Sequence, residues 1–424
     1  MFAFFSAFAT FLVLGVPVVF VLLLAALVPV VLAGNTHLLL AFPQRMFAGV
    51  DQFVLLTIPL FLFAGNIMNA GAITEKLIRF CQLLVGWLRG GLALVNVLAS
   101  LLFGGISGAA AADAVAIGKI LIPGMKKEGY DEDFAAALTG VSSVIGSIIP
   151  PSISMIIVGV LGGMSIADLF VAGIVPGVML GVGLMGYSLI VAHRRGYPKA
   201  DSVDMSQAWS IVRDALPVLL LPLIILGGIL GGVFTPTEAA AVASFYALAI
   251  AAFFYRTLKW EAVTRALYDT CMTTSAIMLV VAMANIVSWV FTLASVPQQA
   301  VDFIFSLTDN RIAILLLINV FLLFIGAILE PIGALILTMP ILLEVGKALG
   351  MDPLHLGVMV VLNLVIGLAT PPVGICLFIV STISKVPFLA VARAALPMLA
   401  ICIVVLLLIT LVPELSTTLP GWLN

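Results

Sequence analysis

Charge is scarce in this sequence: only 9% of its 424 residues are Asp, Glu, Lys or Arg, whereas a soluble globular protein carries about 25%. Hydrophobic residues make up 63% of the chain, and the mean hydropathy is +1.31. No basic tract is present that would bind nucleic acid, and the net charge of −2 is uninformative about partners. The composition excludes a soluble domain with one anchor. It predicts a chain that crosses the lipid bilayer many times, with about 20 apolar residues per crossing.

Metal-binding and catalytic patterns are missing as well. The four cysteines are scattered through apolar segments without a CxxC pair, which favours buried small hydrophobic residues. His37, His193 and His355 share no spacing. The sequence has no GxxxxGK phosphate-binding loop, no HExxH and no GxSxG. We therefore expect neither an enzyme nor an ATPase, and any transport must draw its energy from an ion gradient or from a partner protein.

Two short segments with consecutive prolines interrupt long apolar stretches. Residues 145–151 read IGSIIPP and residues 366–372 read IGLATPP. Proline lacks a backbone donor and clashes with the preceding helical turn. In hydrocarbon, such broken backbone is tolerated only where it is buried in protein or lines a cavity. One break in each half of the chain therefore indicates a binding site built from interrupted helices.

A fixed offset of 221 residues relates the two halves. It pairs identical residues as follows: Gly105 with Gly326, Gly129 with Gly350, Asp131 with Asp352, Ile145 with Ile366, Gly146 with Gly367, Pro150 with Pro371, Pro151 with Pro372 and Pro176 with Pro397. A chance match in a glycine-rich apolar chain is the alternative. We interpret the offset as two structural repeats, residues 1–199 and 215–424, joined by a polar linker over 200–214.

Each repeat is expected to hold a re-entrant hairpin and a broken helix, so the fold class is an all-α polytopic membrane protein. The hairpins are predicted at 91–124 and 311–347, and the broken helices at 134–162 and 354–383. Amphipathic segments at 72–89 and 296–310 are expected to lie in the membrane interface. The N-terminus lacks the basic region and the cleavage site of a signal peptide, so residues 3–33 are predicted to form a first membrane helix.

Loop charge indicates how the repeats lie in the membrane. Lys and Arg gather around residues 126–127, 193–199, 256–265 and 385–393, and the positive-inside rule places these loops in the cytoplasm. The first hairpin then opens to the cytoplasm and the second to the outside. The repeats are thus predicted to be inverted, as in many secondary transporters. The side of the N-terminus is left open.

The first hairpin turns at residues 103–109, FGGISGA. Its small residues free carbonyls and amides at the tip, where half-helix ends can face ions; a close-packing seam of small residues is the alternative. Polar and proline residues of the next helix are expected to face this tip and its Ser107: Ser142, Ser143, Ser147 and Pro150. Their hydroxyls and the freed carbonyls would supply sodium with oxygen ligands. Asp113, on the returning arm, either bonds to the tip or binds an ion.

The second hairpin turns at residues 326–331, GAILEP, and places Glu330 inside an apolar stretch. An intramembrane carboxylate is costly and marks a functional site by default. Glu330 is predicted to bind a cation or proton or to cap the half-helix that starts at Pro331; a position at the lipid edge or facing water is the remaining alternative. The residues expected to face this tip are Asn363, Gly367, Ala369, Thr370 and Pro371.

Several stretches together resemble the large membrane subunit, DctM-like, of tripartite ATP-independent periplasmic (TRAP) transporters. They are FGGISGAAAADAVAIGKILIPGM, GSIIPPSISMIIVG, GVFTPTEAAAVA and GAILEPIGALILTMPIL, followed by GLATPPVG. The resemblance runs from about Pro59 to Pro397. It implies a multi-pass protein of the bacterial inner membrane with inverted repeats and an elevator mechanism.

The resemblance also implies partners and a cargo. Such subunits work with a small four-helix membrane subunit (DctQ-like) and a periplasmic substrate-binding protein (DctP-like). They import organic acids such as C4-dicarboxylates, sialic acid or sugar acids, driven by sodium (Na+), the coupling ion, with no organic cofactor. The small subunit is expected not to be fused here, because the chain starts directly at the first large-subunit helix.

Two sodium sites follow from the resemblance. The first matches Ser107, Gly108, Gly146, Ser147 and Pro150, and the second matches Gly326, Gly367, Thr370 and Pro371. Other polar residues are expected near the substrate or the ions: Ser142, Ser143, Asp113, Glu330 and Asn363. Many relatives have serine where this chain has Ala109, so one hydroxyl ligand is expected to be missing.

The mechanistic hypothesis is that hairpins and broken helices form a moving transport domain, while the other spans form a scaffold. The substrate carboxylate would sit between the tips, held by half-helix N-termini and sodium, because no Lys or Arg lies near either tip. Three alternatives remain: a stand-alone ion-coupled carrier of organic anions, a membrane-embedded enzyme, and a permease driven by a separate ATPase. The enzyme would need a polar catalytic cluster, and none is visible.

Overall fold

The computed structural model describes residues 2–70, 73–199 and 207–423, and across them the secondary structure is helical with no β-strand beyond one isolated bridge. Seven of the helices in these ranges are long and apolar enough to cross a membrane: Phe53–Ala70, Ile166–Arg195, Ala208–Leu230, Pro236–Phe254, Trp260–Leu293, Pro331–Ala348 and Phe388–Leu411. The expectation of an all-α polytopic membrane protein is confirmed.

The N-terminal segment differs from the expected single helix. It forms two helices that pack against each other, α1 (Phe2–Val13) and α2 (Val18–Leu32). The break falls at Gly15, whose φ of +75° is left-handed, followed by Pro17, which cannot donate the bond that would continue the helix. The prediction of one tilted span over residues 3–33 is therefore wrong. Phe4 instead packs edge-on against Phe291, with ring centroids 4.8 Å apart.

The remaining helices of the first half follow the expected order. They are α3 (Ala41–Val50), α4 (Thr57–Ala70), α5 (Ile73–Val85), α6 (Gly91–Ser107), α7 (Ala110–Lys127), α8 (Glu132–Ser142), α9 (Ile153–Gly162) and α10 (Ile166–Arg195). Short 3₁₀ turns precede α3 (Thr36–Leu40), precede α4 (Phe53–Leu56) and follow α8 (Ser143–Ser147). The α6–α7 pair is the expected hairpin, and α8 with α9 is the expected broken helix.

The second half repeats this succession. Its helices are α11 (Ala208–Leu230), α12 (Pro236–Ala249), α13 (Trp260–Leu293), α14 (Val296–Leu307), α15 (Arg311–Gly326), α16 (Pro331–Ala348), α17 (Pro353–Gly367), α18 (Ile375–Ser384), α19 (Phe388–Leu411) and α20 (Glu414–Leu423), with a π turn over Ile250–Phe254. The α15–α16 hairpin and the broken helix α17–α18 correspond to α6–α7 and α8–α9. Residues 200–206 of the linker predicted at 200–214 lie outside the described residues. Residues 208–214 belong to helix α11, so the linker prediction is wrong over that part. The inverted relation of the halves stays a prediction.

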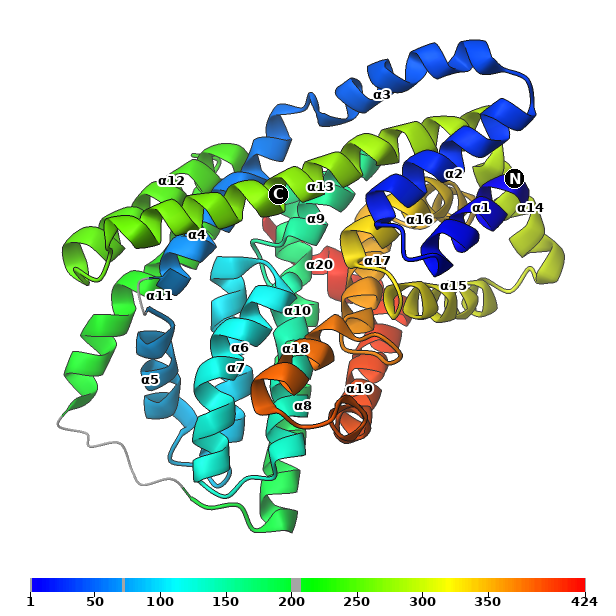
Figure 1. The fold of residues 1–424 in the computed structure, drawn as a ribbon. Coiled ribbons are helices and arrows are strands. Elements are labelled where there is room, and N and C mark those ends of the chain that lie inside the picture. The colour runs from blue at the N-terminus through cyan, green and yellow to red at the C-terminus, as the bar shows by residue number, and fades with distance from the viewer. Residues whose placement is uncertain (1, 71–72, 200–206, 424) are drawn as a thin grey trace.

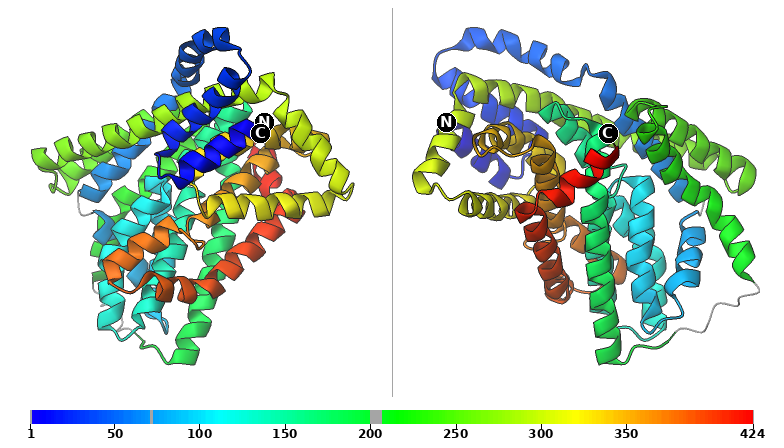
Figure 2. Two further views of the ribbon diagram at one scale, coloured as in Figure 1. Left: turned by 45° about the vertical axis from the view of Figure 1, so that its right-hand side comes forward. Right: turned by 180° about the vertical axis from the view of Figure 1, so that it is seen from behind.

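The two halves interlock through their broken helices. The second part of the first broken helix, α9, packs against α16 and α17, and its counterpart α18 packs against α7 and α8. The half-helix that follows each break therefore packs against the hairpin of the other half. Helix α13 runs diagonally across this body and contacts α2, α3, α4 and α16 (Figures 1 and 2). The first break is buried within protein, whereas Pro372 and Val373 of the second break are exposed.

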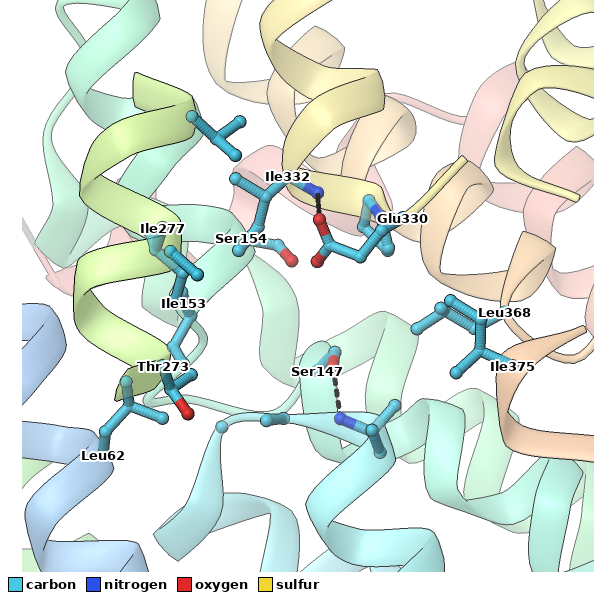
Figure 3. Close-up of a pocket in the computed structure, with 17 residues that line it drawn as sticks. Leu62, Ser147, Ile153, Ser154, Thr273, Ile277, Glu330, Ile332, Leu368 and Ile375 are labelled. Carbon is cyan, nitrogen blue, oxygen red and sulfur yellow. Dashed lines mark hydrogen bonds between the residues drawn. The ribbon is translucent and has the colours of Figure 1, made fainter. Parts of the chain in front are cut away.

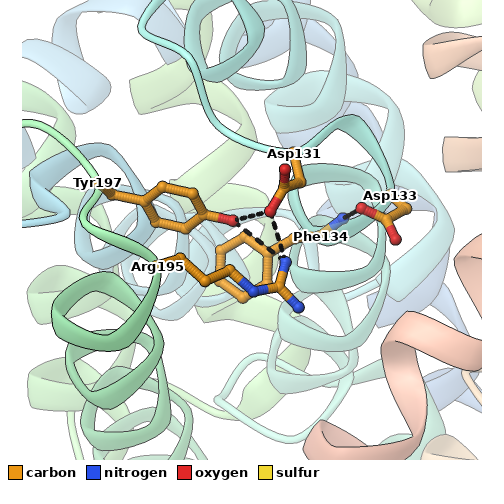
Figure 4. A network of polar contacts seen from close by, with 5 residues as sticks. All are labelled: Asp131, Asp133, Phe134, Arg195 and Tyr197. Carbon is orange, nitrogen blue, oxygen red and sulfur yellow. Dashed lines mark hydrogen bonds and ion pairs between the residues drawn. The ribbon is translucent and has the colours of Figure 1, made fainter.

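The aspartates related by the 221-residue offset have different partners. Asp352 accepts bonds from the amides of Leu354 and His355 and so caps α17. Asp131 makes no such cap and turns to the end of α10 (Figure 4). Its Oδ2 lies 2.6 Å from Nη1 of Arg195 and accepts the hydroxyl of Tyr197 at 2.7 Å. The hydroxyl of Tyr197, then the guanidinium of Arg195, lower the pKa of Asp131.

We predict that the Asp131 network stabilises the fold only while its carboxylate is charged. Because the pKa is lowered in the folded protein, this stabilisation is present above the unfolded value of about 3.9 and is lost as pH falls through the folded value. Asp131→Asn should lower the thermal midpoint in detergent at pH 7, because the free energy of unfolding loses the ~1 kcal/mol or less that an exposed ion pair contributes. The difference in thermal midpoint between Asp131→Asn and the wild type should become smaller towards pH 3. Asp352→Asn, which keeps a capping oxygen, should stay near wild type; an equal loss in both variants would contradict the prediction.

Candidate functional site between the two hairpin tips

One cavity of about 390 Å³ lies where the two hairpin tips approach each other. Gly108 and Ala109 come from the first tip, Glu330 and Pro331 from the second. The broken helices add Ser147 and Ser154 on one side and Leu368 and Ile375 on the other, as Figure 3 shows. The wall opposite comes from α4, through Leu62, and from α13, through Thr273, Ala276, Ile277 and Val280. The hairpins and breaks found from sequence therefore meet at one place.

Close backbone contact positions the first tip. A Cβ on Gly104 would lie 2.6 Å from the Cα of Gly146, so α6 and the broken helix touch backbone to backbone. Gly108 ends α6 with φ +63°, and a Cβ there would lie 2.4 Å from the carbonyl oxygen of Pro151. Across this contact the amide of Ala110 donates to Oγ of Ser147 at 2.8 Å (Figure 3). The tip is thereby fixed beside the cis bond between Pro150 and Pro151.

The second tip is built the same way with different bonds. A Cβ on Gly367 would lie 2.4 Å from the carbonyl carbon of Gly326. The tip is held by a backbone bond, from the amide of Val373 to the carbonyl of Ala327 at 3.3 Å. The hydroxyl of Thr370 donates to the carbonyl of Ile366, in its own helix, at 2.9 Å. The adjacent Pro371–Pro372 bond is also cis.

The two half-helices that start at the tips differ in charge. Glu330 caps α16: its Oε2 accepts from the amides of Ile332 at 3.2 Å and Gly333 at 3.4 Å, while the side chain borders the cavity (Figure 3). This is the capping alternative left open by the sequence. The cap position of α7 is Ala109, which has no capping oxygen of its own, and the amide of Ala110 donates to the hydroxyl of Ser147 rather than to a carboxylate. The positive end of the α7 dipole therefore faces the cavity, while that of α16 is covered by a carboxylate.

Some predicted residues lie behind the cavity rather than in it. Ser142 bonds to Ser100 and to the amide oxygen of Asn96, each at 3.1 Å, and Ser143 bonds to the carbonyl of Gly140. In the other half, Asn363 donates to the side chain of Asn319 at 2.7 Å. Ser142 and Asn363 are related by the 221-residue offset. They form equivalent polar clamps between the first hairpin arm and the broken helix.

Asp113 and Ser107 are buried without partners. Asp113 is fully buried, and neither of its carboxylate oxygens has a hydrogen-bond partner among the described residues. The same holds for Oγ of Ser107, which is 3% exposed. The carboxylate faces the broken helix, since a Cβ on Gly146 would lie 3.2 Å from Oδ2. Buried groups of this kind call for an ion, a water molecule or a proton.

The sequence did not point to the wall made by α4 and α13. Thr273 and Ile277 lie one turn apart on α13 and face the cavity, as do Leu62 of α4 and Ser154 of α9 (Figure 3). The cluster Thr273, Thr274 and Ser275 inside an apolar span was a usable signal, because hydroxyls are uncommon there. Leu62 gave no comparable signal in the sequence, because it is one leucine among many.

Comparison with known proteins matches the fold and the cavity to transport. Residues 5–415 match the family model for the DctM component of tripartite ATP-independent periplasmic transporters. The chain belongs to this family. It is 40% identical to the sialic acid TRAP transporter large permease protein SiaM of Vibrio cholerae, covering 96% of this chain and 95% of that protein. It is 39% identical to the C4-dicarboxylate TRAP transporter large permease protein DctM of Pseudomonas aeruginosa, covering 90% and 89%.

Solved structures show the same fold at low identity. The YdaH transporter of Alcanivorax borkumensis superposes with a TM-score of 0.63 at 15% identity, covering 92% of this chain and 89% of that one. MtrF of Neisseria gonorrhoeae, described as one of a class of antimetabolite efflux pumps, gives 0.63 at 12% identity, covering 89% and 84%. The DctM-family chain is thus a multi-pass protein of the bacterial inner membrane, and its relatives are transport permeases rather than enzymes.

We predict that the glycine contact at the second tip tolerates no side chain. Gly367→Ala places a methyl group 2.4 Å from backbone that cannot move aside, and overpacking of this kind costs about 1–3 kcal/mol. The thermal midpoint in detergent should fall clearly. Gly227→Ala is the matched control, because it is helical with nothing within 4 Å of the new methyl. A Gly367→Ala protein with the same thermal midpoint as Gly227→Ala would refute the close contact.

Proposed function

We propose that this chain is the large membrane subunit of a sodium-coupled TRAP transporter that imports an organic acid delivered by a periplasmic binding protein. The cavity between the two hairpin tips carries the proposal, because it joins both breaks, a helix N-terminus without a carboxylate cap and a scaffold wall in one place. The names of relatives support the cargo class: sialic acid, C4-dicarboxylate and, for a 37% identical protein of Escherichia coli, 2,3-diketo-L-gulonate.

The substrate carboxylate would lie at the first tip. Glu330 is the one ionisable residue among the described residues that line the cavity, and it would repel an anion from the second tip. The N-terminus of α7 offers amide groups and the positive end of its dipole instead. The hydroxyl of Ser147 lies at this tip as well. We infer that the carboxylate faces Ala110 and Ala111, while Glu330 faces the hydroxyl-bearing or amide-bearing part of the acid.

Sodium would be the second cargo, bound at both breaks. The first site would use Ser107, Gly108, Gly146, Ser147 and Pro150, and the second would use Gly326, Gly367, Thr370 and Pro371. The unpaired Ser107 hydroxyl and the carboxylate of Asp113 support a cation near the first break. A carboxylate buried without any counter-charge is costly, and a cation beside it removes that cost.

The hairpins and broken helices would move together against the other helices, as in an elevator. Their interlocked packing, with α9 on α16 and α18 on α7, supports a single moving body. The cavity lies between this body and α4 and α13, where a moving carrier would hold its cargo. Helices α5 and α14 would join the two parts along the membrane interface.

The proposed partners are a small four-helix membrane subunit and a periplasmic substrate-binding protein. A 38% identical relative, the isethionate TRAP transporter permease protein DctMQ of Oleidesulfovibrio alaskensis, supports the small subunit: the match covers 98% of this chain but 66% of that longer protein. The second candidate is a stand-alone carrier of organic anions. Uptake measured without the binding protein distinguishes the two, because a stand-alone carrier would still transport at full rate.

Sodium coupling can be tested by ion replacement. Proteoliposomes containing the chain and its small subunit should take up labelled sialic acid, succinate or 2,3-diketo-L-gulonate when the binding protein and a sodium gradient are present. Uptake should stop when potassium replaces sodium at equal ionic strength, because the breaks would lose their cation. Uptake that persists in potassium would refute the coupling.

We also predict that the two breaks contribute unequally to sodium affinity. Ser147→Ala should raise the half-saturating sodium concentration by about fivefold, the equivalent of about 1 kcal/mol, because this hydroxyl faces the cavity. Thr370→Ala should have less effect, since Thr370, unlike Ser147, does not border the cavity. Thr382→Ala is the matched control: its hydroxyl makes the same type of helix bond as that of Thr370, to Phe378, away from the cavity. Equal shifts in Ser147→Ala and Thr370→Ala would contradict the asymmetry.

A further inference from the structure

A second cavity, of about 720 Å³, lies beside the first and has a different character. Its wall is mostly polar, with amides from α4, one lysine from α7, and charged residues from the loop before α13 and its first turns. The cationic residues on this wall are Lys119, Lys259 and Arg265, and the acidic ones are Glu261 and Asp269. The relatives' names and the family description assign nothing to it.

The two cavities follow the same pair of helices. On α4, Leu62 borders the first cavity and Asn66, one turn later, borders the second. On α13, Thr273 borders the first and Asp269, one turn earlier, borders the second. Between them the amide of Asn66 donates to the hydroxyl of Thr270 at 2.9 Å. One helical turn, about 5.4 Å, therefore separates an apolar-walled site from a polar one.

Helix α7 connects the proposed carboxylate position with the second cavity. Its N-terminus at Ala110 and Ala111, which has no carboxylate cap, borders the first cavity, and Lys119 on the same helix borders the second. Eight residues of α-helix from Ala111 to Lys119 span about 12 Å. An anion that leaves the N-terminus along α7 therefore meets the ammonium of Lys119 next.

The cations on this wall are available to a ligand. The ion pairs found within residues 2–70, 73–199 and 207–423 join other residues, so Lys119, Lys259 and Arg265 are not engaged in one. Glu261 and Asp269 lie one turn either side of Arg265 on α13 and offset its charge. Lys119 approaches from α7, whose N-terminus borders the first cavity. The wall carries three cations against two acids.

We propose that this second cavity is a release vestibule, a weaker carboxylate-binding site centred on Lys119 through which the organic acid passes between the tip cavity and the cytoplasm. Lys259 and the cationic loops near it place this end of the molecule in the cytoplasm by the positive-inside rule. A cleft with a surplus of cations raises the local concentration of an anion and its rate of entry, about tenfold or more at low salt. The proposal rests on the proposed function above.

A side-specific transport measurement tests the vestibule. Proteoliposomes with sialic acid on both sides of the membrane exchange internal for external acid. The KM for the internal acid and the KM for the external acid are measured separately. Lys119→Gln should raise the internal KM roughly tenfold and leave the external KM, set at the binding protein, unchanged. Lys119→Arg should restore the wild-type value, and Lys127→Gln, an exposed lysine at the end of the same helix, is the control. Equal internal KM values for wild type and Lys119→Gln would overturn the proposal.

A second measurement needs no transported substrate, so it separates failure of the vestibule from failure of the proposed function. In a Cys271→Ser background, which removes the exposed cysteine among the described residues, Ala262→Cys places a thiol on the vestibule wall. Anionic and cationic methanethiosulfonate reagents are then compared. The anionic reagent should react relatively faster, and Lys119→Gln should abolish that preference, whichever acid is carried. A ratio of rates that Lys119→Gln does not change would overturn the proposal even if sodium-driven uptake is observed.

Discussion

The structure depends on the need to bury backbone that no helix satisfies. Each Pro–Pro break and each hairpin tip leaves amides and carbonyls unpaired, and hydrocarbon offers them no partner. Close backbone contacts between glycines bury these segments: Gly104 packs on Gly146 in one half, and Gly326 packs on Gly367 in the other. These contacts bring each tip close enough to its break for a hydrogen bond to form between them. The cavity is the space that remains where the two tips approach each other.

The repeated scaffold carries different chemistry in its two halves. The first tip is tied to its break by the neutral side chain of Ser147, which bonds the first amide of α7, and has no carboxylate at its helix N-terminus. The second tip is tied by backbone, and the carboxylate of Glu330 caps its helix. One end of the cavity therefore favours an anion and the other repels it. This polarity supports an organic acid with its carboxylate at the first tip, and it needs no Lys or Arg in the cavity wall. Cationic side chains border only the second cavity, where Lys119 lies about 12 Å further along α7.

Much of this arrangement was predictable from sequence because the signals are local or periodic. Consecutive prolines in apolar stretches located both breaks, and the 221-residue offset predicted matching elements in the two halves. Glu330 was recognised as costly and was correctly given a capping alternative. The prediction of a single N-terminal helix was wrong, because apolar composition continues unbroken past Gly15 and Pro17 and does not reveal the turn there. Phe4 gains a packing partner in Phe291 when the chain folds back.

By itself the sequence determined the membrane environment, the helical class, the broken helices and the family motifs, since apolar length and proline chemistry act within a few turns of chain. Only the tertiary structure decided which residues share a cavity. Ser142, Ser143 and Asn363 are used in clamps behind it, while Leu62 and Thr273 form its wall. Helix α4 and helix α13 are some 200 residues apart in the chain, and no local pattern records how two such helices pack. The physical reason is that the packing of helix faces depends on all neighbours at once.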